Sequence, residues 1–202
     1  MYEEAFKSNK HLWNVWAANH AKAGFYDVEG FKAGQCALKH IEVEALGAEV
    51  TGKSLLHLQC HFGLDSLSWA RRGADVTGID FSREAIQIAR ALSTETSIPA
   101  TFVESDLYDL PNQLQGTFDM IFTSYGVLGW LPDLEKWAAI IGQFLKPGGT
   151  FYIVEFHPFF YTFEFADQEM VYPYFNHGAI KEENEGSYAH RGAEYKTTSY
   201  WW

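Results

Sequence analysis

The sequence predicts an α/β protein whose doubly wound, mainly parallel sheet is covered by helices on both faces. Three observations support this fold class. Five short apolar segments have the length and composition of buried strands. Amphipathic segments with helical periodicity lie between most of them. Turns separate the two kinds of segment, and this alternation is typical of a parallel sheet with crossover helices.

The predicted elements follow one another in a regular order. Two helices come first, and the second is ended by Gly47. Strands then alternate with helices, and Ser82 and Asp133 are the expected N-caps of two of these helices. The predicted strands are residues 54–58, 75–79, 100–104, 118–123 and 150–156, and the predicted helices are residues 9–23, 37–46, 64–72, 82–92 and 133–145.

The segment after the fifth strand has a different character. It is rich in Phe, Tyr and Trp and shows no convincing helical pattern, so an aromatic-rich, β-leaning C-terminal segment is expected. The sequence closes on Trp201 and Trp202. Because terminal residues are usually polar and frayed, we expect either that these rings pack into the domain or that the chain has been cut short.

Composition excludes several function classes. The net charge is -11 and basic residues are scattered, which argues against a nucleic-acid partner. No apolar run approaches the roughly 20 residues that a membrane span requires, so no membrane partner is expected. Two cysteines do not suggest a disulfide framework, and a cytoplasmic location is the expectation. The eight histidines and two cysteines show no metal-ligand spacing.

Three consecutive strand ends carry residues suited to a ligand. In open α/β sheets, ligands bind beyond the carboxyl ends of the strands. The loop after the first strand contributes backbone N–H groups, and an acid at the end of the second strand typically accepts hydrogen bonds from ribose hydroxyls. An acid after the third strand can accept from an exocyclic amine. The candidates are Gln59, Cys60, His61 and Gly63 in the loop, Asp80, Phe81 and Ser82 after the second strand, and Asp106 and Leu107 after the third.

These landmarks resemble those of the class I S-adenosylmethionine-dependent methyltransferases, in a type 11/25-like form. The resemblance rests on "LLHLQCHFGLDSLSWARRGADVTGIDFSREAIQIAR", on "VESDLYDLP" and on the "LKPGG" turn before the fifth strand, and it runs from about residue 52 to 158. It implies a Rossmann-like fold and S-adenosyl-L-methionine as cofactor, with S-adenosyl-L-homocysteine as product. Ser124, Tyr125 and Gly126, after the fourth strand, are candidates for backbone contacts to the methionine part of the cofactor; a plain strand-to-loop turn is the alternative.

The first loop departs from the pattern of that family. The usual acid-x-Gly-x-Gly-x-Gly run is represented here by His57, Gln59, His61 and Gly63, so the acid and two glycines are absent. S-adenosylmethionine has no phosphate for the backbone to approach, and side chains are tolerable at these positions if φ stays negative. We therefore interpret the segment as a modified cofactor loop.

Several candidates have a plainer structural reading. Phe81 can stack on adenine or fill the core, and Asp106 can bind adenine or be a solvated loop acid. His57 is more readily explained as a core histidine than as a base. Asp65 is more readily explained as an acid that stabilises a helix N-terminus than as a catalytic residue. A lid over the sulfonium is the alternative to simple core packing for the aromatic residues Trp13, Trp16, Phe25 and Tyr26. His20, Tyr125 and His157 are candidate bases, but the catalytic residue is left unassigned.

The predicted function is methyl transfer from S-adenosylmethionine to a small molecule whose acceptor atom the sequence does not specify. "TSYG" replaces the (Asp/Asn)-Pro-Pro-(Tyr/Phe) motif of the family members that methylate amide or exocyclic nitrogens. A cofactor-binding protein without transfer remains an alternative, as does a fold without ligand. A nicotinamide-dependent oxidoreductase would need a Gly-x-Gly-x-x-Gly motif after the first strand, and that motif is missing.

We expect one domain, with a helical lid over residues 1–50, a cofactor-binding core over 52–158 and a substrate-side or truncated segment over 159–202. If truncated, the fifth strand is an edge open to a homodimer.

Overall fold

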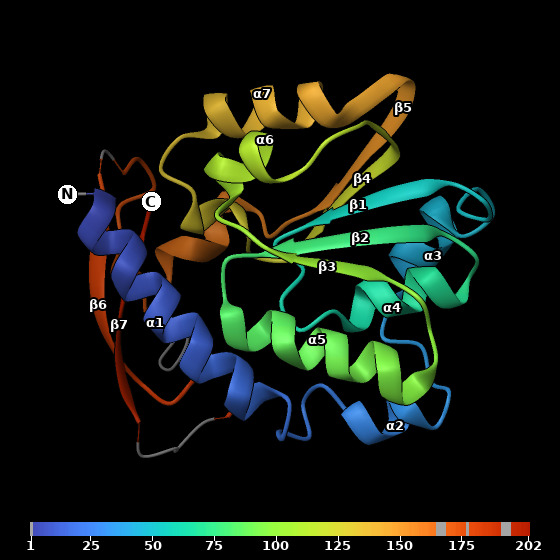
Figure 1. Cartoon of the computed structure of the whole chain (residues 1–202). Helices are drawn as coiled ribbons and strands as arrows, with labels where there is room; N and C mark the ends of the chain where they lie inside the picture. Colours follow the sequence, from blue (N-terminus) through green and yellow to red (C-terminus); the bar gives the residue numbers. More distant parts are fainter. Residues whose placement is uncertain (1, 165–168, 177, 191–194) are drawn as a thin grey trace.

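The computed structural model describes residues 2–164, 169–176, 178–190 and 195–202 (Figure 1). Its centre is a parallel five-stranded sheet with the strand order β3-β2-β1-β4-β5. The strands are β1 (Ser54–Leu58), β2 (Asp75–Asp80), β3 (Thr101–Glu104), β4 (Phe118–Ser124) and β5 (Leu145–Val154). The parallel sheet predicted from the sequence is therefore confirmed. Strand order reverses between β1 and β4, and this is where a ligand crevice is expected.

Helices cover both faces of this sheet, as predicted (Figure 1). One face is covered by α4 (Leu64–Arg71) and α5 (Arg83–Thr96), and the other by α6 (Leu110–Gln113) and α7 (Leu134–Phe144). The fully buried ring of Trp69 anchors α4, and Trp137, Ile141 and Phe144 pack α7 onto the opposite face. Burying such side chains stabilises the fold by about 1.5–3 kcal/mol each.

The predicted helix caps are present. The Ser82 hydroxyl accepts from the N–H of Ala85 at 3.1 Å, and the Asp133 carboxylate accepts from the N–H of Lys136 at 2.9 Å. These bonds satisfy N–H groups that the first helical turn leaves unpaired. The fifth strand starts earlier than expected, at Leu145 rather than residue 150, because the Lys-Pro-Gly-Gly segment already belongs to β5.

The N-terminal segment differs in detail from the prediction. Helix α1 (Tyr2–His20) begins seven residues before the predicted start at residue 9. Its first turns are polar and gave no periodic signal, but Asn9 is buried and exchanges two hydrogen bonds with the backbone of Tyr200, at 2.7 and 2.8 Å. A short helix α2 (Val28–Lys32) was not predicted. Helix α3 (His40–Leu46) begins three residues later than expected.

The C-terminal segment forms a separate two-stranded antiparallel sheet, which agrees with its β-leaning composition. Strands β6 (Ile180–Glu185) and β7 (Lys196–Trp201) pair with Ile180 opposite Trp201. The pair lies beside α1, on the side of the molecule where β1, β2 and β3 end (Figure 1). Trp201 and Trp202 are half-buried, and the N–H of Trp202 donates to the carbonyl of Gly129 at 2.8 Å. The two rings thus pack against the domain.

Short 3-10 turns complete the connections. They are η1 (Leu107–Asp109), η2 (Leu128–Trp130) and η3 (Pro158–Thr162). Within the described residues, no helix has the length and apolar character to cross a membrane. The same residues contain no group of three or more His, Cys, Asp or Glu side chains arranged to hold a metal ion.

Candidate cofactor site and its aromatic cover

The loop after β1 has an unusual backbone. Gln59, His61 and Gly63 have φ angles of 54°, 51° and 80°, all in the left-handed region. The condition expected to make side chains tolerable there, a negative φ, is therefore not met at Gln59 and His61. The loop keeps a shape suited to glycine, although side chains stand at two of the three positions. Such a conformation costs about 1–3 kcal/mol for each non-glycine residue, so surrounding contacts must hold it.

Contacts from the neighbouring strands hold this loop. The N–H of Cys60 donates to the carbonyl of Ile79 on β2 at 2.8 Å, and the N–H of Gly63 donates to the carbonyl of Cys60 at 3.0 Å. The side-chain amide of Gln59 lies 3.4 Å from the carbonyl of Val127, beyond β4. Cys60 is buried, and burial raises the pKa of its thiol well above its usual range, so it is a neutral packing residue here.

Asp80, at the end of β2, is the main anchor of the site. Its Oδ2 accepts from the N–H of His61 and its Oδ1 from the N–H of Ser82, each at 2.8 Å. Burial raises the pKa of this carboxyl to about 6, against the opposing effect of these hydrogen bonds, so at neutral pH the group is mainly ionised. Each carboxylate oxygen keeps a second lone pair. The group can thus hold the loop and still accept hydrogen bonds from ribose hydroxyls.

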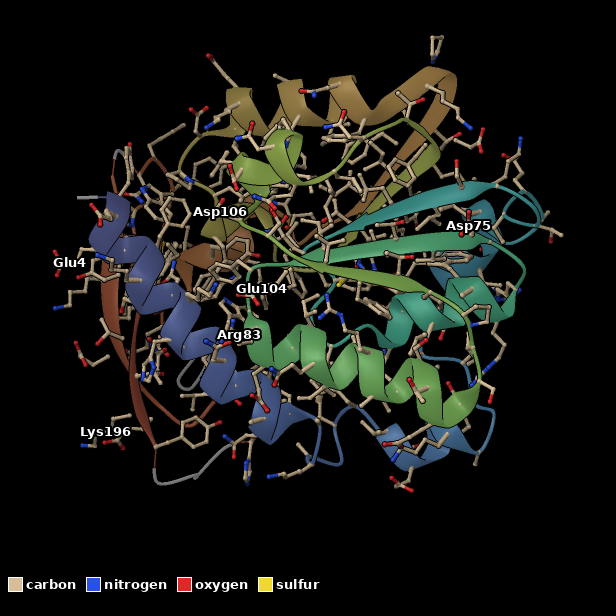
Figure 2. All side chains as sticks on the ribbon, in the orientation of Figure 1. Glu4, Asp75, Arg83, Glu104, Asp106 and Lys196 are labelled. Atoms are coloured by element: carbon tan, nitrogen blue, oxygen red, sulfur yellow. The ribbon has the colours of Figure 1, made fainter. Side chains whose placement is uncertain are left out.

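Asp106 lies after the adjacent strand β3. Its Oδ1 accepts from the N–H of Tyr108 at 2.8 Å and so caps η1, whose first residue, Leu107, is buried. Figure 2 shows Arg83, Glu104 and Asp106 on the side of the core that faces α1, with Asp75 at the other end of β2. Phe81 is half-buried, and Ser82 is fully buried. Phe81, Ser82 and Asp106 thus lie at the edge of the sheet where β2 and β3 end.

The turn after β4 is held by a residue that the sequence did not single out. Tyr125 and Gly126 have φ angles of 47° and 75°. Glu155, just after β5, accepts the N–H groups of Gly126, Val127 and Leu128 at 2.6, 2.7 and 3.0 Å. A carboxylate with several backbone donors is a strong local constraint. Glu155 therefore fixes the turn whose Val127 carbonyl meets Gln59.

Two further carboxyl groups lie under this turn. Burial raises the pKa of Asp65 to about 6, and the Ser124 hydroxyl and Lys39 partly oppose the shift. Burial and the nearby Asp65 raise the pKa of Glu42 to about 7. Glu42 also accepts from the N–H of Lys39 at 2.5 Å and interacts with the Tyr125 hydroxyl. The sequence analysis assigned Asp65 only to a helix N-terminus. It did not predict that Asp65 lies near Glu42, because Glu42 comes from a different helix.

Aromatic rings lie over the loop after β1 and the segment that follows β4. The ring of Trp13 lies 5.3 Å from those of both His61 and Trp130, and so it bridges the two segments. Trp16 packs against Tyr188 at 5.6 Å, and its indole N–H donates to the carbonyl of Gly186 at 3.1 Å. We call this set the aromatic cover; its members are Trp13, Trp16, His20, Tyr26, Trp130 and Tyr188.

The predicted lid residues fall into two groups. Trp13, Trp16 and Tyr26 belong to the aromatic cover, whereas Phe25 is 66% exposed and touches only its edge, at Tyr26 and Tyr188. Sequence reasoning missed Trp130 and Tyr188, because nothing local indicates that they meet α1. A salt bridge from Lys10, one helical turn before Trp13, to Glu104 at 2.9 Å ties α1 to β3.

The candidate histidines occupy different environments. His57 is a buried core residue; its Nδ1 lies 2.8 Å from the Ser66 hydroxyl, and burial lowers its pKa to about 3. His157 is exposed, and its Nδ1 accepts from the N–H of Phe159 at 3.2 Å. His20, itself part of the aromatic cover, is fully buried and lies next to His61. Only His20 and His61 therefore lie at the candidate site.

Comparison with known proteins agrees with this arrangement. A parallel sheet with acids at the ends of β2 and β3 defines an α/β domain of the nucleoside-binding class. Residues 55–149 match the family model described as a methyltransferase domain. The PH0226 protein from Pyrococcus horikoshii has a similar fold, with a TM-score of 0.55 and 21% identity over 65% of this chain and 62% of that one. A putative S-adenosyl-L-methionine-dependent methyltransferase from Methanococcus maripaludis gives a TM-score of 0.51, with 21% identity over 57% and 54% of the two chains.

Curated relatives point in the same direction. The chain is 35% identical over 113 residues to the ubiquinone biosynthesis O-methyltransferase of Photorhabdus laumondii, which covers 56% of this chain and 44% of the relative. It is 31% identical over 143 residues to the enzyme of the same name from Proteus mirabilis. That match covers 68% of this chain and 54% of the relative. The chain spans about half the length of these relatives. It belongs to the class I S-adenosylmethionine-dependent methyltransferase family.

Proposed function

We propose that this protein binds S-adenosylmethionine at the carboxyl ends of β1, β2 and β4 and transfers its methyl group to a small molecule. The observation that carries the proposal is the position of Asp80. Its carboxylate fixes the loop after β1 and the start of α5, and it stands at the sheet edge where ligands of this fold class bind. Asp106 on the neighbouring strand end offers an acceptor for the adenine amine.

The residues present suit the cofactor. It carries ribose hydroxyls, which donate to carboxylates, and a sulfonium cation, which aromatic faces attract. When bound, it supplies an activated methyl group on a good leaving group. The chain then has to position the acceptor and exclude water. The aromatic cover, in which Trp13 packs against both His61 and Trp130, is suited to both tasks.

We further propose a hydroxyl-bearing small molecule with an aromatic part as methyl acceptor. The relatives named as O-methyltransferases favour an oxygen acceptor. The aromatic rings beside the site favour a flat apolar ring, because aromatic pairs gain stability beyond their buried area. In this proposal residues 1–50 act as the lid, residues 52–158 as the cofactor-binding core and residues 159–202 as the substrate side. The contacts of Gly186 and Tyr188 with Trp16 support that division.

Calorimetry with S-adenosylmethionine and S-adenosylhomocysteine, together with a methyl-release assay on small phenols, tests the proposal. We expect one binding site for each ligand and transfer to at least one phenol. Binding without any transfer would leave the protein a cofactor-binding protein. Absence of binding in a folded sample would contradict the proposal as a whole.

A further inference from the structure

Three side chains from distant parts of the sequence form a hydrogen-bonded chain that includes His20 of the aromatic cover. The Nε2 of His20 lies 2.8 Å from the Ser187 hydroxyl, and its Nδ1 lies 3.1 Å from Nε2 of His61. His20 is fully buried. The remaining ring nitrogen, Nδ1 of His61, is buried and has no hydrogen-bond partner among the described residues. We call Ser187, His20 and His61 the histidine chain.

Hydrogen bonding couples the tautomers of the two rings. If the Ser187 hydroxyl oxygen accepts from His20 Nε2–H, then His20 Nδ1 accepts from His61 Nε2–H, and His61 Nδ1 presents a bare lone pair. The opposite arrangement leaves His61 Nδ1–H as a buried donor without an acceptor. Either way, a buried polar atom at the edge of the cofactor loop lacks a partner, which is costly unless a ligand supplies one.

The surroundings keep both rings neutral. Burial, with a smaller contribution from His190, lowers the pKa of His20 to about 4. Burial, with a contribution from His20, lowers the pKa of His61 well below its usual range. The rings nearest to His61 are those of Phe62 at 4.4 Å, His20 at 5.2 Å, Trp13 at 5.3 Å and Tyr26 at 5.6 Å. An unprotonated nitrogen in such surroundings can accept a hydrogen bond from a flat aromatic alcohol.

We propose that Nδ1 of His61 accepts the hydroxyl proton of the methyl acceptor, and that His20 and Ser187 fix the tautomer which makes this possible. This inference rests on the proposed function. As the acceptor oxygen bonds to the methyl carbon, the carbon–sulfur pair stays on sulfur. The oxygen–hydrogen pair stays on oxygen, and the proton passes to Nδ1. The positive charge is then shared by the two imidazole rings, with the Ser187 oxygen accepting from His20.

A base with a lowered pKa is adequate for this step. A neutral hydroxyl that attacks a methyl cation equivalent develops positive charge on its oxygen, and its proton becomes strongly acidic. The base is therefore needed late, when even a weak lone pair accepts the proton. His61 also needs no prior deprotonation at neutral pH, because it is already neutral.

The first test is independent of activity. Nitrogen-15 spectra of the free protein with labelled histidine report which ring nitrogen carries the proton. We expect His61 to be protonated at Nε2 and bare at Nδ1, and Ser187→Ala to produce a mixture of tautomers. A His61 protonated at Nδ1 in the wild type would overturn the proposal, whatever the activity.

The second test measures transfer to catechol and to the more acidic 4-nitrocatechol. His61→Asn keeps a residue that tolerates positive φ, and it should lower the rate by about 100-fold or more with catechol. The loss should be smaller with 4-nitrocatechol, because an acidic hydroxyl depends less on a base. Ser187→Ala, which acts through His20, should lower the rate with catechol by about tenfold. His40→Gln, on an exposed side chain, is the matched control and should keep the wild-type rate.

The outcomes separate this inference from the proposed function. Unchanged affinity of His61→Asn for S-adenosylhomocysteine, together with slow transfer, supports the histidine chain as the base. Wild-type rates in His61→Asn overturn it, while the proposed function stands. An equal loss with both catechols also overturns it, since a purely structural defect would ignore the acidity of the acceptor. Transfer to neither probe by the wild type would defeat the proposed transfer and the base together.

Discussion

The backbone N–H of His61 donates to Oδ2 of Asp80 at 2.8 Å, and this bond ties the loop after β1 to the end of β2. The other oxygen of the same carboxylate accepts from the N–H of Ser82 and so holds the start of α5. One side chain thereby fixes two segments that line the candidate cofactor site. The bond to His61 also holds that residue in a conformation with positive φ, which is strained for a non-glycine residue.

Replacing Gly63 should be costly for two separable reasons. Gly63 has a φ of 80°, and a Cβ there would lie 2.7 Å from the ring of Phe102. Gly148 has a similar φ of 77°, but a Cβ there meets nothing within 4 Å. We expect Gly63→Ala to lower the free energy of unfolding by about 2–4 kcal/mol and Gly148→Ala by only about 1 kcal/mol, as measured by urea denaturation. Equal losses would show that the contact with Phe102 is unimportant.

Glu155→Ala should loosen the turn after β4. The substitution leaves the N–H groups of Gly126, Val127 and Leu128 without their acceptor. We expect a loss of about 1–3 kcal/mol in stability and a weaker affinity for S-adenosylhomocysteine, with partial recovery in Glu155→Gln. Denaturation and calorimetry measure the two effects. Glu49→Gln, at an exposed position, is the control. A Glu155→Ala protein with wild-type affinity would show that this turn does not shape the site.

The raised pKa of Asp65 gives a pH-dependent stability with a definite sign. The folded-state value of about 6 exceeds the ordinary value of 3.8, so the folded form binds the proton more tightly. The resulting stabilisation is complete below about pH 4 and is lost as pH rises through 6. Asp65→Asn escapes that loss. Relative to the wild type, the variant should therefore gain up to about 3 kcal/mol between pH 4 and 8. Melting curves at several pH values check this, with Asp75→Asn as the exposed control. A difference independent of pH would contradict the assignment.

Ligand binding should alter the aromatic cover. Trp13 packs against both His61 and Trp130, so a ligand that binds between these two residues must move its ring. We expect tryptophan emission to change during titration with S-adenosylhomocysteine, and Trp13→Phe to remove most of that change. Trp69→Phe, in the core under the sheet, should keep the response. If Trp13→Phe responds like the wild type, the ligand does not enter beneath this ring.

The sequence predicted what local pattern determines. The strands and helices around Asp80 were expected within a few residues, because apolar periodicity and capping residues are local signals. The contributions of Glu155, Glu42 and Tyr188 could not be predicted. Each acts on a segment distant in the sequence, and no periodicity marks such a contact. Positive φ at Gln59 and His61 was missed because nothing local reveals that a non-glycine residue keeps the conformation of glycine.

The most direct measurement is the affinity of wild-type protein and Asp80→Asn for S-adenosylhomocysteine, by calorimetry, with folding of both samples verified by their melting curves. An amide offers a single acceptor oxygen and no negative charge, so we expect saturable one-to-one binding to the wild type and an affinity lowered by about tenfold or more in the variant. Equal affinities, or no binding to the wild type, would contradict the placement of the nucleoside at the end of β2.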